Sequence, residues 1–406
     1  MIKPGLKIIF FLAARGINKH KFSSFVAIFT ISMAAGLFLS TWQINLETRK
    51  AFSNSANGFD AVLGARGSKL QIILNSLFHL EESPGNLAWE QYELIKSAPG
   101  VRRAYPIAVG DNYHGYRLVG TEPEMFQEHE WKPGQKFDVK PGGRIFSPVA
   151  KEALVGSFVA QKLGLGVGDK FHPYHGLDFK EENKHEDIYL VVGVLEYTGT
   201  PADRVIWVPI KGIQLMEGHD KSMAQTISAV LLKLNGAAGI SLHTKYNRQG
   251  NVATLAWPVA STLSSFFDKF SWFQTVLEII ATMVAIVGCM IILLSLRSSM
   301  NERKREFAIL RFLGAPRKAV TAVIIWQSVI LAVSGGVVGI GIHLLINLAV
   351  FQVIREKTGV VLEVFSLDSS AIFVLVAILI VGLISGILPA IQAYKNELSE
   401  NLKLNN

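Results

Sequence analysis

Four stretches of the chain are long and apolar enough to cross a lipid bilayer, and this feature limits the fold more than any other. A membrane-spanning helix needs about 20 apolar residues. The four stretches are residues 22–42, 273–296, 320–351 and 371–394. The third is longer than a bilayer requires, so we expect it to tilt or to emerge at its ends. We therefore predict an α-helical membrane protein with four transmembrane helices.

The excess of basic over acidic residues is confined to two short segments beside the apolar stretches. The net charge is +8. Residues 1–21 carry five basic residues and no acidic one, and residues 297–318 carry seven basic residues against two acidic ones. Residues 43–272 hold 24 basic and 24 acidic residues. Short cytoplasmic loops collect Lys and Arg, whereas long translocated domains do not. Both termini are therefore predicted to be cytoplasmic and residues 43–272 extracytoplasmic, and this neutral segment offers no basic surface to nucleic acid.

Residues 1–21 combine apolar positions with Lys7, Arg15, Lys19 and Lys21. Such a segment is typical of a helix that lies in the cytoplasmic interface before the chain enters the membrane. We predict a cytoplasmic amphipathic elbow here; the alternative is a simple extension of the first membrane helix. The stretch that follows is too long for a cleaved signal peptide and shows no convincing cleavage site, so we expect it to be retained.

Residues 43–272 are predicted to form a large mixed α/β domain between the first and second membrane helices. Strand-like apolar runs bounded by turn residues occur at 116–121, 152–158, 188–197, 204–210 and 227–236. Helical spacing is seen in residues 87–96, and residues 157–163 are predicted to form a short helix that ends at Gly164. Residues 250–273 are also helix-like and lead back to the membrane. The single cysteine lies inside an apolar stretch, so a disulfide framework is excluded.

Two segments of this domain resemble ligand sites only superficially. "GARGSK" (64–69) lacks the spacing of a phosphate-binding loop, and we interpret it as a turn. Three histidines lie close to four acidic residues: His172, His175, His185, Asp178, Glu181, Glu182 and Asp187. The segment that joins them is strongly polar and has no helical His pair, so we favour a solvated loop over a metal site. Whether this loop binds metal stays open.

An apolar helix is predicted directly after the turn. Leu70, Ile73, Leu74 and Leu77 share one face of it. Packing within the domain is the first interpretation, and these four residues are the candidate substrate-facing residues if the face recognises an apolar ligand. No catalytic or metal-binding constellation emerges elsewhere, so an enzyme is not expected, and no cofactor is assigned to this chain.

Small residues recur four positions apart in the apolar stretches, which lets helices approach closely. Gly335 and Gly339 form one such pair, and Gly382 and Gly386 form another. We predict that they serve helix packing within a tight bundle or between two copies of the chain. Glu278 and His343 are ionisable residues within or near the apolar stretches. We expect both at the outer membrane interface.

The segment between the second and third apolar stretches, residues 297–319, combines dense charge with an apolar row. "NERKREFAILRFLG" places Phe307, Leu310 and Leu313 at helical spacing, and Gly314 and Pro316 are typical of a helix end. A loop that only sets topology would need the charges but neither the apolar row nor the helix end. We therefore predict a short amphipathic helix at the cytoplasmic surface, where a soluble partner can dock.

These residues resemble the MacB/FtsX-type permeases of ABC transporters, the mechanotransmitting class. The resemblance rests on "NERKREFAILRFLGAPRKAV" (301–320) followed by "SVILAVSGGVVGIGIHLL" (328–345), and on "LPAIQAYKNELSENLK" (388–403) at the end of the chain. Residues 97–110, 152–171 and 189–210 resemble that family's periplasmic core domain. The order of one helix, an external domain and three helices also matches, so the resemblance covers nearly the whole chain.

The resemblance implies a permease driven by two copies of a cytoplasmic ABC ATPase. Some members carry the ATPase on the same chain, but no nucleotide-binding motif is found here, so ATP and Mg²⁺ are expected on a separate partner. The family's docking surface maps by motif position onto Glu302, Arg303, Glu306, Leu310, Arg311 and Gly314. A second permease copy is also implied, as a homodimer rather than a heterodimer, and a periplasmic adaptor or outer-membrane component is a further expected partner.

The resemblance leaves three functions open. The first is export or efflux of periplasmic or membrane-derived substrates, powered by ATP hydrolysis on the partner. The second is a lipoprotein-releasing permease, which the apolar face of residues 70–80 keeps under consideration. The third is an FtsX-like regulator of cell-wall hydrolases that transports nothing. In each case the chain is expected in the cytoplasmic (inner) membrane.

Overall fold

The structure is a computed structural model of the 406-residue chain, and it divides the chain into two units. The first unit comprises Met1–Leu46, Ser271–Val350 and Glu363–Asn406, and the second comprises Glu47–Phe270 and Phe351–Leu362. The structure describes every residue except 1–5, 55–56, 217–223, 303–304, 307–308, 310–311, 313–314, 364–371, 373–375, 378, 381, 388–389 and 392–406.

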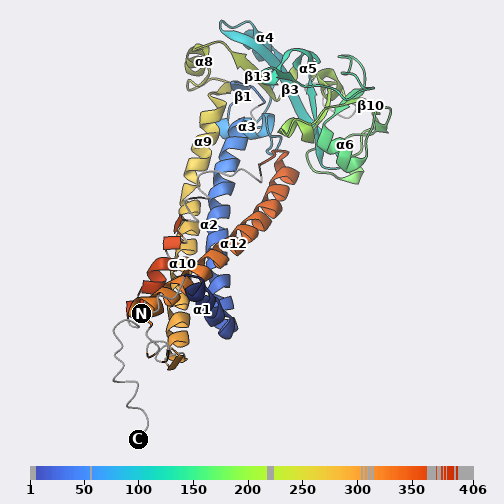
Figure 1. The fold of residues 1–406 in the computed structure, drawn as a ribbon. Helices are drawn as coiled ribbons and strands as arrows, with labels where there is room; N and C mark the ends of the chain where they lie inside the picture. Colours follow the sequence, from blue (N-terminus) through green and yellow to red (C-terminus); the bar gives the residue numbers. More distant parts are fainter. Residues whose placement is uncertain are drawn as a thin grey trace. The chain divides into compact units, whose positions relative to one another are not determined.

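The first unit is built from long helices (Figure 1). They are α1 (Leu6–Lys19), α2 (Lys21–Asn54), α10 (Ser271–Glu302) and α12 (Arg317–Thr358). Among the described residues, three helical spans are long and apolar enough to cross a membrane: Lys21–Phe52, Ser271–Glu302 and Lys318–Thr358. The fourth predicted span, residues 371–394, lies largely outside the described residues, so the count of four stays a prediction.

Two boundaries of the helices bear on the sequence-based expectations. The chain breaks at His20, so α1 and α2 are separate helices rather than one extended helix. The Ser24 hydroxyl donates to the Ile17 carbonyl at 3.2 Å and stabilises this junction. The predicted third and fourth stretches leave residues 352–370 as a short external loop, but α12 continues beyond Phe351 to Thr358. These last turns belong to the second unit, where Glu356 pairs with Lys162 and the Lys357 carbonyl accepts from Arg204. An estimate from bilayer thickness does not anticipate such contacts.

Glycines let the helices of the first unit approach within van der Waals contact. A Cβ atom at Gly36 of α2 would lie 2.8 Å from Ile342 of α12, and one at Gly335 would lie 2.8 Å from Ile31 of α2. A Cβ at Gly382 would lie 2.5 Å from the Cβ of Ala332, and one at Gly386 would lie 2.3 Å from Ser328 Oγ. All four predicted packing glycines, Gly339 included, therefore meet another helical segment of the same chain. Their use between two copies stays a prediction.

We expect Gly339→Val to destabilise the helical unit by about 1–3 kcal/mol, because inserted methyl groups force packed helices apart. A Cβ at Gly339 would lie 2.8 Å from the Cβ of Ala35 and 3.1 Å from the carbonyl oxygen of Ser32, and backbone cannot yield. Gly341 on the same helix has no atom within 4 Å of its Cβ position, so Gly341→Val is the matched control. Thermal unfolding of both variants in detergent measures the difference. Equal melting temperatures would show that this contact does not support the unit.

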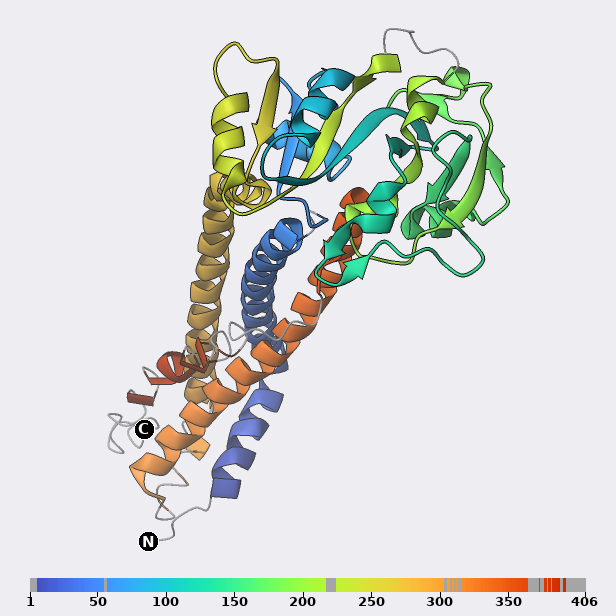
Figure 2. The same cartoon turned by 90° about the horizontal axis from the view of Figure 1, so that it is seen from above.

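The second unit is built around a ten-stranded sheet (Figures 1 and 2). Its strand order is β14-β1-β13-β3-β4-β11-β7-β10-β8, and β9 pairs with β3. The strands are β1 (Ala61–Ala65), β3 (Val101–Tyr113), β4 (Tyr116–Thr121), β7 (Glu152–Val155), β8 (Lys170–Phe171), β9 (Tyr174–His175), β10 (Tyr189–Val194), β11 (Ile206–Pro209), β13 (Ala229–Leu234) and β14 (Ala253–Ala256). Two short pairs accompany them, β2 (Leu87–Ala88) with β12 (Thr226–Ile227) and β5 (Glu130–Lys132) with β6 (Gln135–Lys136).

Strand β3 holds the two parts of the sheet together. Its first residues pair with β13 from Val101 to Ile107, and its last pair with β4 from Ala108 to Tyr113. The register shifts between Val109 and Asp111, where the strand bulges. A bulge bends a strand and redirects its side chains, so the residues after it face a different set of neighbours from those before it.

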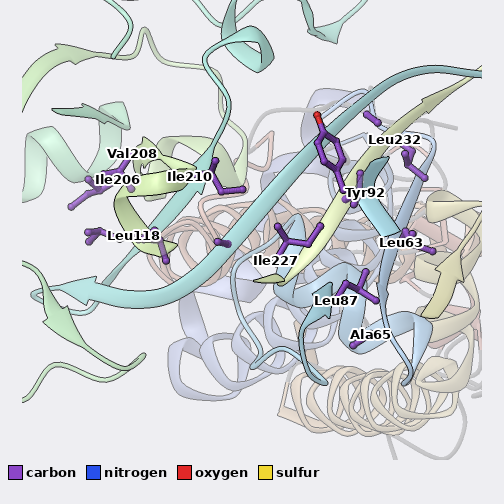
Figure 3. Close-up of a cluster of buried hydrophobic side chains, with 14 of the residues drawn as sticks. Leu63, Ala65, Leu87, Tyr92, Leu118, Ile206, Val208, Ile210, Ile227 and Leu232 are labelled. Atoms are coloured by element: carbon purple, nitrogen blue, oxygen red, sulfur yellow. The ribbon is translucent and has the colours of Figure 1, made fainter. Parts of the chain in front are cut away.

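Helices cover the sheet and enclose its apolar core. They are α3 (Lys69–Ser76), α4 (Trp89–Lys96), α5 (Glu124–Glu128), α6 (Ser157–Leu163), α7 (Ile210–Gln214), α8 (Ala238–Tyr246) and α9 (Val259–Lys269), with 3₁₀ turns η1 (Glu181–Asn183) and η2 (Pro201–Arg204). The core side chains come from both parts of the sheet and include Leu63, Tyr92, Leu118, Ile206 and Leu232 (Figure 3). Burial of such side chains supplies about 1.5–3 kcal/mol each before the entropy of folding is counted.

Most of the expected strands of this unit are present, and two assignments needed correction. The run predicted as one strand over residues 152–158 ends at Val155, and α6 begins at Ser157, because Gly156 lies against the backbone of residues 202–203 and turns the chain. The segment expected to be helical over residues 250–273 begins instead with strand β14, which pairs with β1. Gly164 ends α6 with a φ of 68°, as its position in the sequence predicts.

Candidate functional site: the charged segment and the helix ends

Two of the six predicted docking residues are described, and both are held beside the junction of α1 and α2. Glu306 Oε1 lies 3.3 Å from Lys19 Nζ, and Glu302 Oε2 lies 3.7 Å from His20 Nε2. Arg303, Leu310, Arg311 and Gly314 lie outside the described residues. Both carboxylates are about half exposed, and such surface pairs contribute about 0–1 kcal/mol. A partner could therefore replace these contacts at little cost.

The charged segment also presents apolar side chains. Phe312 is 87% exposed, and Ile309 is exposed as well. The predicted row of Phe307, Leu310 and Leu313 lies outside the described residues. Sequence analysis did not select Phe312, although an aromatic residue among arginines is a signal for a docking surface, because aromatic and Arg side chains are enriched at interface centres.

The far end of α12 belongs to the second unit and is tied to it by charged and aromatic contacts. Glu356 Oε1 accepts from Lys162 Nζ at 3.3 Å, and Arg204 Nη1 donates to the carbonyl of Lys357 at 2.7 Å. The Arg355 guanidinium lies 5.8 Å from the ring centre of Phe158 and 5.7 Å from that of Tyr197. Glu356 Oε1 also accepts a hydrogen bond from Gln352 Nε2 at 3.4 Å.

The far end of α2 is tied to the same unit by aromatic packing. The Phe52 ring stacks on Phe78 at 4.9 Å and meets the edge of Phe267 at 5.5 Å. Arg49 Nη1 lies 2.5 Å from Asp268 Oδ1 on α9. Aromatic pairs of this kind contribute about 0.5–1.5 kcal/mol beyond the area they bury. Both α2 and α12 are thus unbroken helices whose last turns pack on the α/β unit.

A polar cluster lies where α2 meets α12. Ser40 Oγ shares a hydrogen bond with His343 Nδ1 at 3.2 Å, and Asn347 Nδ2 donates to Gln43 Oε1 at 2.8 Å. Gln43 in turn donates to the carbonyl of Glu363 at 3.2 Å. On α10, Glu278 accepts from Gln274 at 2.7 Å, one turn away. Each of these side chains has at least one hydrogen-bond partner within the chain, as groups in apolar surroundings require, although Asn347 Oδ1 has none among the described residues.

Two of the candidate substrate-facing residues are not accessible to a ligand. Ile73 and Leu77 are buried in the domain, because α3 packs on β1, β14 and α9. This corrects the substrate-facing interpretation for both of them and favours packing. Leu70 and Leu74 are half-buried. The "GARGSK" segment forms the turn between β1 and α3, as expected.

The histidine-rich loop contributes two of its three histidines to one cluster. His175 and His185 converge on Asp111, which β3 supplies. The cluster does not include His172, Asp178, Glu181, Glu182 or Asp187. Asp187 forms an ion pair with Lys151 instead. The participation of Asp111 was missed, because it is far from the loop in sequence and only the pairing of β9 with β3 brings it close.

Comparison with known families agrees with these features. Residues 24–241 match the MacB-like periplasmic core domain, and residues 254–398 match the C-terminal domain of FtsX-like permeases. The chain is 27% identical over 227 residues to the ABC transporter permease YvrN of Bacillus subtilis, which covers 53% of this chain and 51% of YvrN. It is also 27% identical over 193 residues to the permease MJ1507 of Methanocaldococcus jannaschii, which covers 47% of this chain and 45% of MJ1507. The chain thus spans about half the length of the curated relatives it matches.

Two solved structures of extracytoplasmic regions are also similar. The extracellular domain of the noncanonic ABC-type transporter YknZ from Gram-positive bacteria matches with 17% identity and a TM-score of 0.29, over 48% of this chain and 97% of that domain. The periplasmic region of MacB from Actinobacillus actinomycetemcomitans matches with 11% identity and a TM-score of 0.35, over 56% of this chain and 98% of that region. Since the core-domain model alone matches more than half of the chain, the protein is a member of the FtsX-like ABC transporter permeases that carry a MacB-like periplasmic core domain.

Proposed function

We propose that the chain is the permease subunit of a MacB/FtsX-type ABC transporter that uses ATP hydrolysis on a partner to move its α/β domain. The partner is a separate cytoplasmic ATPase, present in two copies, which binds ATP and Mg²⁺. The permease acts as a pair of copies in the cytoplasmic membrane, with both termini in the cytoplasm and residues 43–272 outside. Movement of these domains drives export of periplasmic or membrane-derived substrates.

The observation that carries this proposal is the continuity of α12 from the charged segment to the α/β unit. α12 is 42 residues long, or about 63 Å at 1.5 Å per residue. The hydrocarbon core of a bilayer is only about 30 Å thick. The helix begins beside the predicted docking segment and ends in the contacts of Arg355 and Glu356 with the α/β unit. A continuous hydrogen-bonded helix transmits displacement along its axis, so docking of the ATPase at one end is felt at the other.

The composition of the spanning helices supports movement rather than a polar conduit. Residues 22–42 and 320–351 contain no Asp, Glu, Lys or Arg, and residues 273–296 contain only Glu278. The polar side chains of Ser40, Gln43 and Asn347 are hydrogen-bonded within the chain. Substrate pathways through a bilayer are marked by ionisable residues that face a cavity. The work of this permease is therefore proposed to take place outside the membrane.

Nothing in the described residues favours the two other functions. Lipoprotein release was considered because of the apolar face on residues 70–80, and the burial of Ile73 and Leu77 removes that argument. No feature of the described residues separates regulation of cell-wall hydrolases from export, so it stays the alternative to export.

We expect Val353→Pro to block ATP-driven movement of the α/β domain. Proline removes a backbone hydrogen bond and clashes with the preceding turn, at a cost of about 3 kcal/mol or more in a helix interior. Val353 is 57% exposed on α12, so little packing is lost with its side chain. An environment-sensitive fluorophore on Ile240→Cys, an exposed position on α8, reports movement when ATP is added to the complex with its ATPase. The single native cysteine is first replaced by Cys289→Ala.

Val353→Ala, which keeps the helix intact, is the matched control. The proposal predicts an ATP-dependent signal in the control and a loss of about tenfold or more in the proline variant, with unchanged fluorophore labelling in the absence of ATP. A full signal in the proline variant would refute transmission through α12. ATP hydrolysis by the purified chain alone would refute the proposal that a separate ATPase hydrolyses ATP. Access to an N-terminal tag from outside intact cells would refute the proposed cytoplasmic position of the N-terminus.

A further inference from the structure

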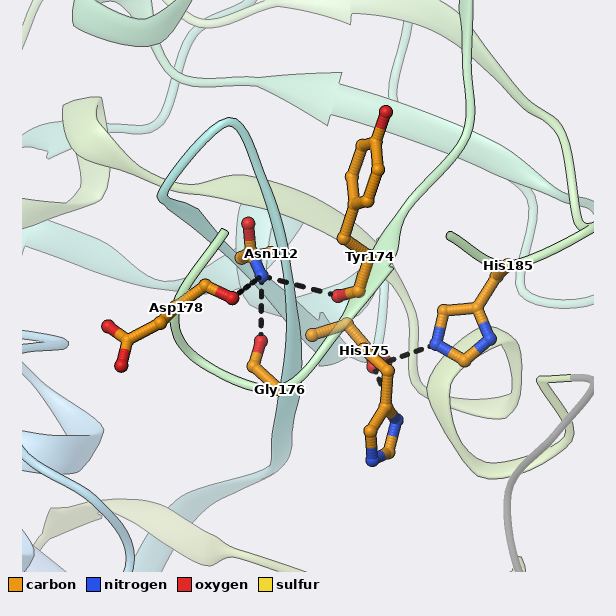
Figure 4. Close-up of polar contacts among 7 residues, drawn as sticks. Asn112, Tyr174, His175, Gly176, Asp178 and His185 are labelled. Atoms are coloured by element: carbon orange, nitrogen blue, oxygen red, sulfur yellow. Dashed lines mark hydrogen bonds and ion pairs between the residues drawn. The ribbon is translucent and has the colours of Figure 1, made fainter. Parts of the chain in front are cut away.

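A cluster of two histidines and an aspartate lies where β9 pairs with β3, remote in sequence from the charged segment. Figure 4 shows the two histidines, His175 and His185. Asp111 Oδ1 lies 3.2 Å from His185 Nε2 and 3.5 Å from His175 Nδ1. The ligand atoms of the three residues all lie within 4.8 Å of one another. Asp111 and His185 are buried, whereas the His175 side chain is 59% exposed. The cluster is therefore closed on one side and open to solvent on the other.

The fold builds this cluster from three separate segments. Asp111 follows the bulge of β3, and His175 is its direct partner in β9. The Asn112 amide donates to the carbonyls of Tyr174, Gly176 and Asp178 at 3.4, 2.9 and 3.2 Å. These bonds fix the turn that carries His175, as Figure 4 shows. His185 is held by its backbone amide, which donates to the carbonyl of Pro173 at 2.9 Å.

We propose that Asp111, His175 and His185 form a binding site for one divalent transition-metal ion such as Zn²⁺. Bonds of about 2.0–2.2 Å from zinc to nitrogen and oxygen place neighbouring tetrahedral ligands about 3.4 Å apart. The two separations measured from the Asp111 oxygen, 3.2 and 3.5 Å, match this value. A hydrogen bond explains the second one less well, because N–H···O bonds cluster between 2.7 and 3.2 Å.

The ligand set selects the class of ion. Imidazole nitrogens suit Zn²⁺ and its neighbours, whereas Mg²⁺ and Ca²⁺ prefer sites made of oxygen alone. Three protein ligands leave a fourth tetrahedral position open on the exposed side of His175. A bound divalent ion also neutralises the negative charge of the buried Asp111 carboxylate. The bound ion would hold the loop of residues 172–187 against β3.

Metal binding by the purified full-length chain in detergent tests this site. After treatment with a chelator, Zn²⁺ titration by calorimetry should show one ion per chain with a dissociation constant below about 1 μM. His175→Gln and His185→Gln should each weaken binding by about 100-fold or more, because each removes a ligand. Co²⁺, used as a spectroscopic probe, should give the intense visible absorption of a tetrahedral site in the original chain and lose it in both variants.

His243→Gln is the matched control, since His243 lies outside the cluster and pairs with Lys69. It should leave affinity and stoichiometry unchanged. Because His175 is exposed, its replacement does not endanger folding, and it keeps the test decisive if His185→Gln fails to fold. Equal Zn²⁺ affinity in His175→Gln and His243→Gln, no binding by the original chain, or tighter binding of Mg²⁺ than of Zn²⁺ would each overturn the proposal.

Discussion

Replacing Glu306 and Arg311 together by glutamine should reduce stimulation of the partner ATPase by about tenfold or more, because loss of a charged residue at an interface centre costs about 2 kcal/mol or more. The Glu306 side chain is half exposed, and Arg311 is another of the predicted docking residues. Glutamine preserves the size of Glu306 and removes only its charge. The measurement is the ATPase rate of the reconstituted complex at increasing permease concentration.

The ion pair with Lys19 provides the control that separates docking from internal support. Lys19→Gln removes the same pair from the other side and keeps the Glu306 carboxylate in place for the ATPase. It should keep full stimulation. Loss of stimulation in Lys19→Gln as well would assign Glu306 a role in holding α1 rather than in docking. If stimulation survives the double change, the docking assignment is wrong.

The membrane part of this fold could be predicted from sequence because its signals are local. A run of apolar residues such as 273–296 has one stable solution in a bilayer, a helix that satisfies its own backbone hydrogen bonds. The structure has α10 over Ser271–Glu302 and α2 over Lys21–Asn54, which agrees with the predicted stretches. The extension of α12 beyond its apolar part was not predictable in the same way. Its last turns are stabilised by residues that are distant in sequence, such as Lys162 and Arg204.

The limits of sequence analysis in the α/β unit have a similar cause. Residues 253–256 are small and apolar, and nothing local separates a strand from a helix there; the choice follows from pairing with β1. The apolar stripe of α3 was correctly placed on a helix, but its periodicity could not show that Ile73 and Leu77 face the domain's own core. The Asp111 cluster depends on the register of β9 against β3, which is a long-range property.

Acidification from pH 7.5 to pH 5 should destabilise the α/β unit by about 4 kcal/mol through two buried histidines, about 2 kcal/mol for each. Burial lowers the pKa of His79 to about 3, and the nearby Arg117 and Arg204 act in the same direction. Burial lowers the pKa of His129 to about 4. Below pH 6.5 the unfolded chain binds protons at these positions and the folded chain does not, so stability falls with pH until the folded pKa values are reached.

The surroundings of the two rings explain why they stay neutral. His129 stacks on Phe59 with ring centres 3.9 Å apart, and its Nε2 lies 2.5 Å from the carbonyl of Asn57. His79 meets the edge of Trp207 at 5.6 Å. Among the residues that the structure describes, neither ring forms an ion pair that would favour the imidazolium. The carboxylates Asp60 and Glu130 raise the pKa of His129 and offset its burial only partly.

Hydrogen exchange of peptides from β1 and β11 measures this loss within the α/β unit of the full-length chain. Burial raises the carboxyl pKa values of Asp203 and Glu122, so acidification stabilises the folded form at those two groups and partly masks the effect of the histidines. Comparison of the original chain with His79→Gln removes the contribution of Asp203 and Glu122, because both chains contain these two carboxylates. The slope of stability against pH between about 4 and 6 should fall by about 1.4 kcal/mol per pH unit in His79→Gln. An unchanged slope would mean that His79 takes up its proton in the folded state, and that burial against Trp207 does not exclude the charge.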